Sequence, residues 1–173
     1  MKASTSQLQL TRSADYAVRA MIHLATLTGA ERTMLPALAT AIEAPSCFLS
    51  KVLQALSRAN LISSRRGPIG GFAILPQGLR ASIREVIEAV DGPIHLNVCL
   101  RSGRSCDRKS WCPAHLVWMR AQAVMVEVLD AAIVADLAAT ADAQGMRGLP
   151  RNSDRKSLDS NEQKSDQRFR AVR

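Results

Sequence analysis

The sequence lacks any apolar stretch long enough to cross a membrane, and it lacks a secretory leader. Its uncharged apolar runs fall well short of the roughly 18 residues that a membrane-spanning helix needs. The first thirty residues contain no basic start followed by an apolar block and a small-residue cleavage site. We therefore expect a cytoplasmic protein with no membrane partner.

The composition also lacks the bias of a fibrous or disordered protein. The chain has 173 residues, of which 47% are hydrophobic, 22% charged and 3% aromatic, and it contains no internal repeat. A collagen-like or wholly disordered chain is excluded, and the length suits one globular domain or two small ones. Because the sequence has no nucleophile–base motif and no phosphate-cradling loop, we expect no enzymatic activity.

Cysteine is scarce, with only four residues in the chain. Thiols stay reduced in the cytoplasm, so metal or redox chemistry explains four cysteines better than a disulfide framework does.

Positive charge exceeds negative charge, and the excess lies at the two ends. The formal net charge is +8, divided as +5 over residues 1–75, zero over 76–141 and +3 over 142–173. Such a field attracts the phosphate backbone of a nucleic acid, but it also attracts membranes and acidic proteins. Charge alone makes a nucleic acid only a candidate partner.

Three apolar-periodic segments in the first third of the chain predict helices. They cover residues 14–27, 35–42 and 48–56, and Ser46 is positioned to cap the third. A break at residues 43–45 separates the last two, which predicts a helix-turn-helix, although an ordinary helical hairpin fits the periodicity as well. The apolar stripe of the third helix includes Phe48. Four polar residues are left to face the groove of DNA: Ser46, Ser50, Lys51 and Gln54.

The next segment predicts a basic hairpin. Residues 61–64 and 72–75 are typical of two short strands. A hairpin directly after a helix-turn-helix is the wing of a winged helix, and its arginines can reach phosphates or the minor groove. An arginine pair at a turn is more often only solvated, but the combination favours DNA binding. The wing residues assigned to the DNA-binding set are Arg65, Arg66, Gly67, Gly70 and Gly71.

Two further helices are predicted after the wing. Ser82 and Glu85 have capping-box spacing at the start of an apolar stripe that ends at Val90. A long helix is predicted from Pro113 to about Ala139, because no further proline or glycine occurs before Gly145. Its apolar stripe is longer than one small domain can cover, so we expect a homodimer through residues 113–139. Burial against the first helix of the same chain is the alternative.

Three cysteines lie between these two predicted helices, and a histidine lies in the first turn of the second one. Cys99, Cys106 and Cys112 are separated by six and then five residues, and His115 follows three positions later. The wide spacing suits an iron–sulfur cluster, because it differs from the close pairs of zinc ribbons and thioredoxin-like sites. The loop is rich in Arg and Lys, and the dipole of the helix after Cys112 favours a thiolate and a neutral imidazole. Zinc binding and thiol–disulfide switching remain the alternatives for the trio.

Several runs of residues resemble one family, the Rrf2 winged-helix transcriptional regulators, which include IscR-like and NsrR-like proteins. The matching runs are residues 10–11, 15–20, 48–56, 60–72, 83–92 and 112–115, together with the three cysteines. Two departures are a first cysteine gap of six residues where five is common, and Glu43 where the family often has glycine. The resemblance implies a homodimeric regulator whose binding to a double-stranded DNA operator depends on a cluster.

The resemblance also implies the cluster ligands. The three cysteines map to Cys99, Cys106 and Cys112, and the fourth ligand maps to His115 for a 2Fe-2S cluster. Asp15 is the alternative fourth ligand, reached from the other subunit, for a 4Fe-4S cluster. We favour His115 and 2Fe-2S, because His115 lies close to Cys112 in the sequence.

The predicted protein is mainly α: a winged helix-turn-helix with a two-strand wing, plus a long dimerisation helix. Its divisions are a flexible extension (1–9), the DNA-binding domain (10–78), the cluster loop with the dimerisation helix (79–141) and a disordered basic tail (142–173). The predicted function is a DNA-binding transcriptional regulator, most simply a repressor, that senses nitric oxide, redox state or iron–sulfur status. The alternatives are a clusterless thiol- or zinc-dependent regulator and an iron–sulfur electron-transfer protein.

Overall fold

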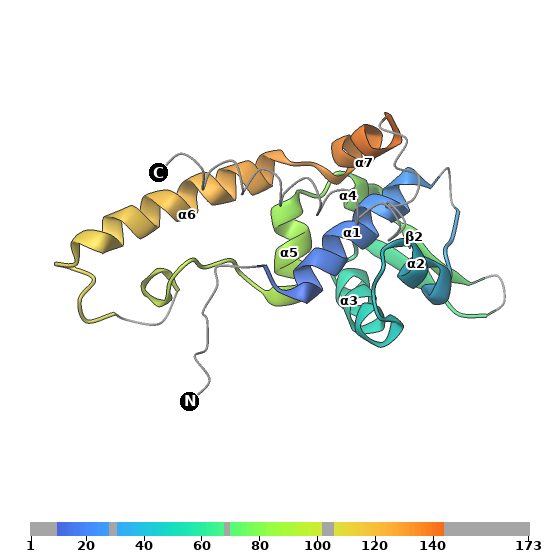
Figure 1. Cartoon of the computed structure of the whole chain (residues 1–173), viewed down its shortest axis with the longest axis horizontal. Coiled ribbons are helices and arrows are strands. Elements are labelled where there is room, and N and C mark those ends of the chain that lie inside the picture. The colour runs from blue at the N-terminus through green and yellow to red at the C-terminus, as the bar shows by residue number, and fades with distance from the viewer. Residues whose placement is uncertain (1–9, 28–30, 68–69, 102–105, 144–173) are drawn as a thin grey trace, which may run out of the picture.

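The computed structural model describes residues 10–27, 31–67, 70–101 and 106–143. A helical body carries a small wing, and one helix projects away from it (Figure 1). The predicted extension (1–9) and most of the predicted tail (142–173) lie outside the described residues. The elements in the described ranges are α1 (Arg12–Thr26), α2 (Leu35–Ala41), α3 (Ser46–Arg58), β1 (Ile62–Arg65), β2 (Gly71–Ile74), α4 (Pro76–Leu79), α5 (Ile83–Asp91), the 3-10 helix η1 (Val98–Leu100), α6 (Pro113–Ala131) and α7 (Val134–Ala143).

The hydrophobic core lies where α1 packs against α3, α5 and α7. Three alanines on the buried face of α1 let these helices approach closely, and Met21 and Leu24 fill the space beside them. Thr11 begins α1 as its N-cap by accepting a hydrogen bond from the Ala14 amide. The same hydroxyl donates to Asp91 at the end of α5 (2.6 Å), which joins the two helices at that edge.

The predicted helix-turn-helix is present as α2 and α3. The apolar face of α3 buries Leu49, Val52, Leu53 and Leu56 in the core. The turn between the helices passes through Glu43, whose φ of +53° lies in the left-handed region. A Cβ atom makes that conformation costly for any residue except glycine. The turn therefore carries local strain at Glu43, one of the two positions where the sequence departs from the family that it resembles.

Replacing Glu43 by glycine is expected to stabilise the protein by ~0.5–1 kcal/mol, because relief of the left-handed strain exceeds the extra entropy of an unfolded glycine. Thermal unfolding followed by circular dichroism would show a rise in Tm of about 1–4 °C. Glu43→Ala is the matched control, since it removes the same carboxylate but keeps the Cβ atom. An equal rise for both variants would assign the effect to charge rather than to backbone conformation.

The predicted hairpin is also present. β1 and β2 pair antiparallel, with Ser63 opposite Ala73 and Arg65 opposite Gly71. Each strand lies within one residue of its predicted position.

The long helix predicted for residues 113–139 is wrong in its extent, because two helices, α6 and α7, occupy that region. The helix is interrupted at Ala132, where the backbone is extended (φ −85°, ψ 101°). The extended segment pairs with the residues just before α5. Ile83 N–H donates to the Ala132 carbonyl (2.8 Å), and Val134 N–H donates to the Ala81 carbonyl (3.0 Å). These bonds satisfy the backbone groups that a continuous helix would have paired internally.

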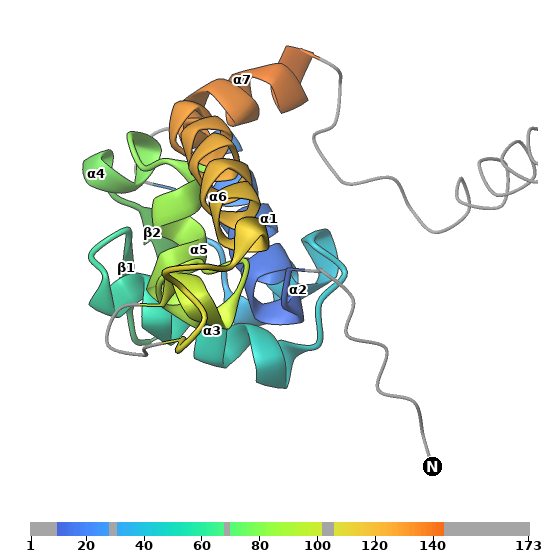
Figure 2. The same cartoon turned by 90° about the vertical axis from the view of Figure 1, so that its left-hand side faces the viewer.

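The two halves of the predicted long helix have different surroundings. α7 packs on α1 and buries Val134 and Ala138, so burial within the same chain is correct for this half. α6 extends away from the body (Figure 1), and Figure 2 views it nearly along its axis. At its base, Asp130 accepts from Arg84 (2.7 Å) and from Ser82 (3.4 Å). This contact region, residues 81–84 with 130–134, is called the α5–α6 joint below.

The predicted capping box at α5 is confirmed. The Ser82 hydroxyl accepts from the Glu85 amide, and the Glu85 carboxylate accepts from the Ser82 amide. Within the described ranges, no helix combines the length and the apolar character needed to span a membrane.

Candidate functional site

The outer face of α3 carries the polar side chains predicted to contact DNA. Ser46, Lys51 and Gln54 are exposed, and Ser50 is half-buried. The predicted capping role of Ser46 is wrong, because the N-cap is Pro45 and Ser46 is already helical without a side-chain cap bond. In Figure 1, α3 lies at the lower edge of the body, on the side opposite α4 and α7.

Phe48 also lies on this outer face. The sequence pattern places it in the apolar stripe of the helix, but 52% of the residue is exposed. The start of α3 therefore presents an exposed aromatic ring next to Cys47, which is also exposed. The helical period alone could not separate Phe48 from its buried neighbour Leu49, since both are apolar.

The five wing residues fall into two groups. Arg65, Arg66 and Gly67 are exposed, so the guanidinium groups are available to phosphates. Gly70 and Gly71 are buried, and a Cβ at Gly70 would lie 2.3 Å from the Arg65 carbonyl oxygen. These two glycines therefore shape the hairpin beneath the exposed arginines.

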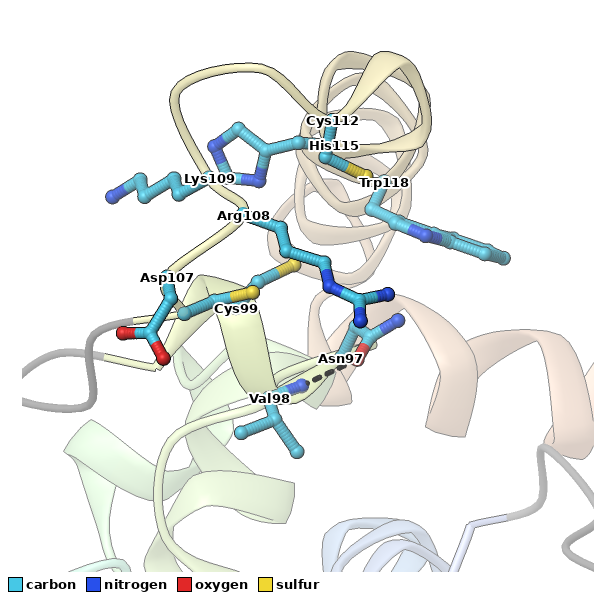
Figure 3. Close-up of a pocket in the computed structure, with 10 residues that line it drawn as sticks. Asn97, Val98, Cys99, Asp107, Arg108, Lys109, Cys112, His115 and Trp118 are labelled. Carbon is cyan, nitrogen blue, oxygen red and sulfur yellow. Dashed lines mark hydrogen bonds between the residues drawn. The ribbon is translucent and has the colours of Figure 1, made fainter.

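The three predicted cysteine ligands lie around one pocket at the far end of α6. Cys99 lies in η1, Cys106 begins the turn that leads to α6, and Cys112 is the N-cap of α6. All three thiols are half-buried and free of disulfides. Their side chains surround a cavity of about 400 Å³, which Figure 3 shows in close-up. Its lining residues are Asn97, Val98, Cys99, Cys106, Asp107, Arg108, Lys109, Cys112, His115 and Trp118.

His115 lines the same pocket from the first turn of α6. It is the only buried residue of that helix, with 6% of its surface exposed. Its Nδ1 atom is buried without a hydrogen-bond partner among the described residues. A buried ring nitrogen without a partner is costly in a folded protein unless a ligand pairs with it.

The chemistry of these donors fits an iron–sulfur cluster. Thiolate sulfur is the usual ligand of iron in such clusters, and histidine nitrogen replaces it in some. Two cationic side chains on the rim, Arg108 and Lys109, suit the negative charge of a thiolate-bound group. Within the described part of the chain, however, no three His, Cys, Asp or Glu side chains converge closely enough to hold a single metal ion. The predicted ligands therefore line one pocket, but their donor atoms do not converge on a single metal position.

Asp15, the alternative fourth ligand, lies elsewhere. Its carboxylate is paired with Arg19 one turn later on α1 (2.8 Å), and it does not line the cysteine pocket. Within one chain, the structure thus brings His115 together with the cysteines and leaves Asp15 on the helix-turn-helix body.

The segment between α5 and α6, called the cysteine loop below, contacts α6 at two places. The Leu96 amide donates to the Gln122 side chain (3.1 Å), and η1 packs against α6. The ring of Trp111, which is 68% exposed, lies under the guanidinium of Arg108 at 6.0 Å. The segment around Leu96 and η1 is therefore in direct contact with α6.

Comparisons with known proteins agree on one family. The family described as Rrf2, iron-dependent transcriptional regulator, matches residues 10–140. The HTH-type transcriptional regulator NsrR of Geobacillus kaustophilus is 28% identical over 131 residues, which cover 75% of this chain and 89% of the relative.

Two solved structures have a similar fold. The global cysteine regulator CymR of B. subtilis has a TM-score of 0.60 and 25% identity, covering 78% of this chain and 98% of CymR. IscR of T. potens has a TM-score of 0.63 and 23% identity, covering 80% and 92%.

Proposed function

Since this chain belongs to the Rrf2 family of transcriptional regulators, we propose that it binds operator DNA as a homodimer under the control of an iron–sulfur cluster held by its cysteine loop. The family places the chain among DNA-binding regulators rather than enzymes or electron carriers. The observation that carries the cluster is the pocket that brings together three cysteines and the unpaired Nδ1 of His115.

Cys99, Cys106, Cys112 and His115 would hold a 2Fe-2S cluster, and a carboxylate in place of the histidine, Asp15 of the partner subunit, is the alternative for 4Fe-4S. When bound, such a group supplies sensitivity to oxidants, to nitric oxide and to iron supply. The protein's part is to exclude bulk water, which half-buried thiols and the buried histidine support.

The exposed face of α6 supports the proposed dimer. Val117, Val124 and Val128 are each at least 60% exposed and recur at helical spacing on one side. If two such helices pack around a two-fold axis, the same valine stripe is buried on both chains. Removing these apolar side chains from water favours the dimer. Two α3 helices then face two half-sites of a palindromic operator.

The chain order supports coupling between the two sites. The cysteine loop joins α5 to α6, and the α5–α6 joint ties α6 back to the body near α1. A different conformation of the cysteine loop would therefore change how α1, α3 and the wing are placed relative to the dimer surface on α6. A coupling of about 1–3 kcal/mol, equivalent to a 5- to 150-fold change in operator affinity, is typical of such linkage. Repression by operator occupancy is the simplest outcome.

The experiment compares cluster-loaded and cluster-free protein, both prepared without oxygen. The probe is a duplex that the protein itself selects from a random-sequence pool, and a gel-shift titration at fixed salt gives the affinity. We expect visible charge-transfer bands with matching iron and sulfide, and at least a fivefold difference in affinity between the two forms. Equal affinities would contradict cluster control while leaving DNA binding intact.

A clusterless thiol-dependent regulator is the second candidate. It is favoured by the similarity to a cysteine regulator and by the absence of a closed metal site in the described residues. Colourless protein whose operator affinity changes with thiol oxidation would support it, whereas colourless protein with stoichiometric zinc would indicate a zinc-dependent regulator.

A further inference from the structure

The segment that precedes α2 pairs with β2 of the wing through an isolated antiparallel β-bridge. Thr33 and Phe72 exchange two backbone hydrogen bonds, each 2.9 Å long. The two backbones are so close that a Cβ atom on Gly71 would lie 2.7 Å from the Thr33 carbonyl oxygen, and Gly71 has a φ of +117°. The wing is therefore seated on residues 32–34 at one fixed position.

Arg32 extends this contact across the hairpin. Its Nη1 atom donates to the Gly71 carbonyl on β2 (3.1 Å), and its Nη2 atom donates to the Ser63 hydroxyl on β1 (3.1 Å). The two bonds use separate nitrogens of one planar group, so the geometry of the pair is fixed. Ser63 in turn donates to the Ala73 carbonyl (3.5 Å), which continues the polar contact along β2.

These bonds lie directly below the exposed arginines of the wing. The register pairs Gly71 with Arg65 and Ala73 with Ser63, so Arg32 contacts both strands at the level where the tip begins. The Arg32 side chain is half-buried, whereas Arg65 and Arg66 are exposed. Arg32 is thus placed to hold the hairpin, and the other two arginines are placed to meet DNA.

We propose that Arg32 is a positioning residue that fixes the wing against the helix-turn-helix and so directs Arg65 and Arg66 toward the DNA backbone. The proposal rests on the DNA-binding part of the proposed function and is independent of the cluster. Without the guanidinium, the hairpin keeps its own strand pairing and the two backbone bonds to Thr33, but it lacks the two Arg32 hydrogen bonds that hold both strands nearer the tip. A two-stranded hairpin has little stability of its own, so the tip beyond Thr33 would then sample more positions.

The test is a double-mutant cycle on operator affinity, with the self-selected duplex as probe and fluorescence anisotropy measured over a range of salt concentrations. The variants are Arg32→Met, the pair Arg65→Ala with Arg66→Ala, and all three substitutions together. We expect Arg32→Met to weaken binding about 3- to 10-fold and to lower the salt slope by about one for each phosphate that the wing no longer reaches. In the background that lacks Arg65 and Arg66, the same substitution should have no further effect.

Two further variants separate positioning from charge and from folding. Arg80→Met removes one exposed arginine from the end of α4, on the opposite side of the body from α3, and should leave affinity and slope unchanged. Arg32→Lys keeps the charge without the fork and should recover only part of the affinity. Amide exchange should quicken in residues 71–74 for Arg32→Met, while α1 and α3 remain protected.

Each alternative result has a defined meaning. If the effects of Arg32→Met and of the double alanine variant simply add, Arg32 contacts DNA itself and the positioning role is wrong. If the double alanine variant weakens binding but Arg32→Met does not, the positioning role fails and DNA binding stands. If wild-type protein binds the duplex without salt dependence, the DNA-binding function itself fails.

Discussion

Replacing Cys99, Cys106 or Cys112 singly by serine is expected to lower the bound iron and sulfide more than about tenfold, because a hydroxyl is a much poorer ligand for iron than a thiolate. The three thiols share one pocket with a buried histidine, so removing one leaves only three of the four proposed donors. Iron and sulfide assays on oxygen-protected protein, together with visible absorption, measure the effect. The variants should bind the operator with the affinity of cluster-free wild type.

Cys47→Ser is the matched control, since this exposed cysteine lies on α3, far along the chain from the pocket. It should leave iron and sulfide content unchanged. Wild-type cluster content in any of the three pocket variants would remove that cysteine from the ligand set.

The same measurement on His115→Ala and Asp15→Ala identifies the fourth ligand. We expect the absorption and electron paramagnetic resonance spectra to change for His115→Ala only, because the unpaired Nδ1 of His115 already lies at the pocket. The opposite pattern would assign the fourth position to Asp15, which would first have to leave its ion pair with Arg19.

Replacing Val124 by aspartate on α6 is expected to produce a monomer and to weaken operator affinity by about 100-fold or more, because two linked half-site contacts become one. Val124 is 60% exposed in the single chain, and Val117 and Val128 extend the same stripe. An unpaired carboxylate in a buried two-fold seam would face its own copy, so desolvation and repulsion both oppose association. Light scattering gives the mass, and gel-shift titration gives the affinity.

Ala123→Asp supplies the matched control for the dimer face. It adds the same charge on the same helix, but its side chain points about 100° away from that of Val124. Dimer mass and affinity should both be retained. A dimeric Val124→Asp protein would show that another surface holds the two copies together.

Local signals in the sequence were sufficient for most of the fold. The capping box at Ser82, the apolar stripe of α3 and the glycine-rich connection of the wing each depend on residues a few positions apart. Pro113 after Cys112 likewise located the start of α6. The start of α6 at Pro113 places Cys112 at the N-cap and His115 in the first turn of the helix. Both residues therefore lie beside Cys99 and Cys106 in the candidate pocket.

The features that could not be predicted depend on contacts between distant segments. No proline or glycine marks the end of α6, which is set by backbone bonds between residues 81–83 and 132–134. The role of Arg32 depends on its lying beside Gly71, which is 39 positions away. Helical period could not reveal that Phe48 is exposed, since the position of α3 against α1 decides which edge of the stripe is covered.

Because the α5–α6 joint lies at one end of α6, a small change in angle there produces a larger displacement at the other end of the helix. The joint lies at one end of a helix of 19 residues, and the cysteine pocket lies at the other. At 1.5 Å per residue the helix spans about 28 Å, so a pivot of about 5° at the joint moves the distant tip by roughly 2.5 Å. In the proposed dimer, a movement of about 1 Å at the cysteine pocket would correspond to a tilt of roughly 2° at the joint, and the two-fold axis would double its effect on the separation of the two α3 helices.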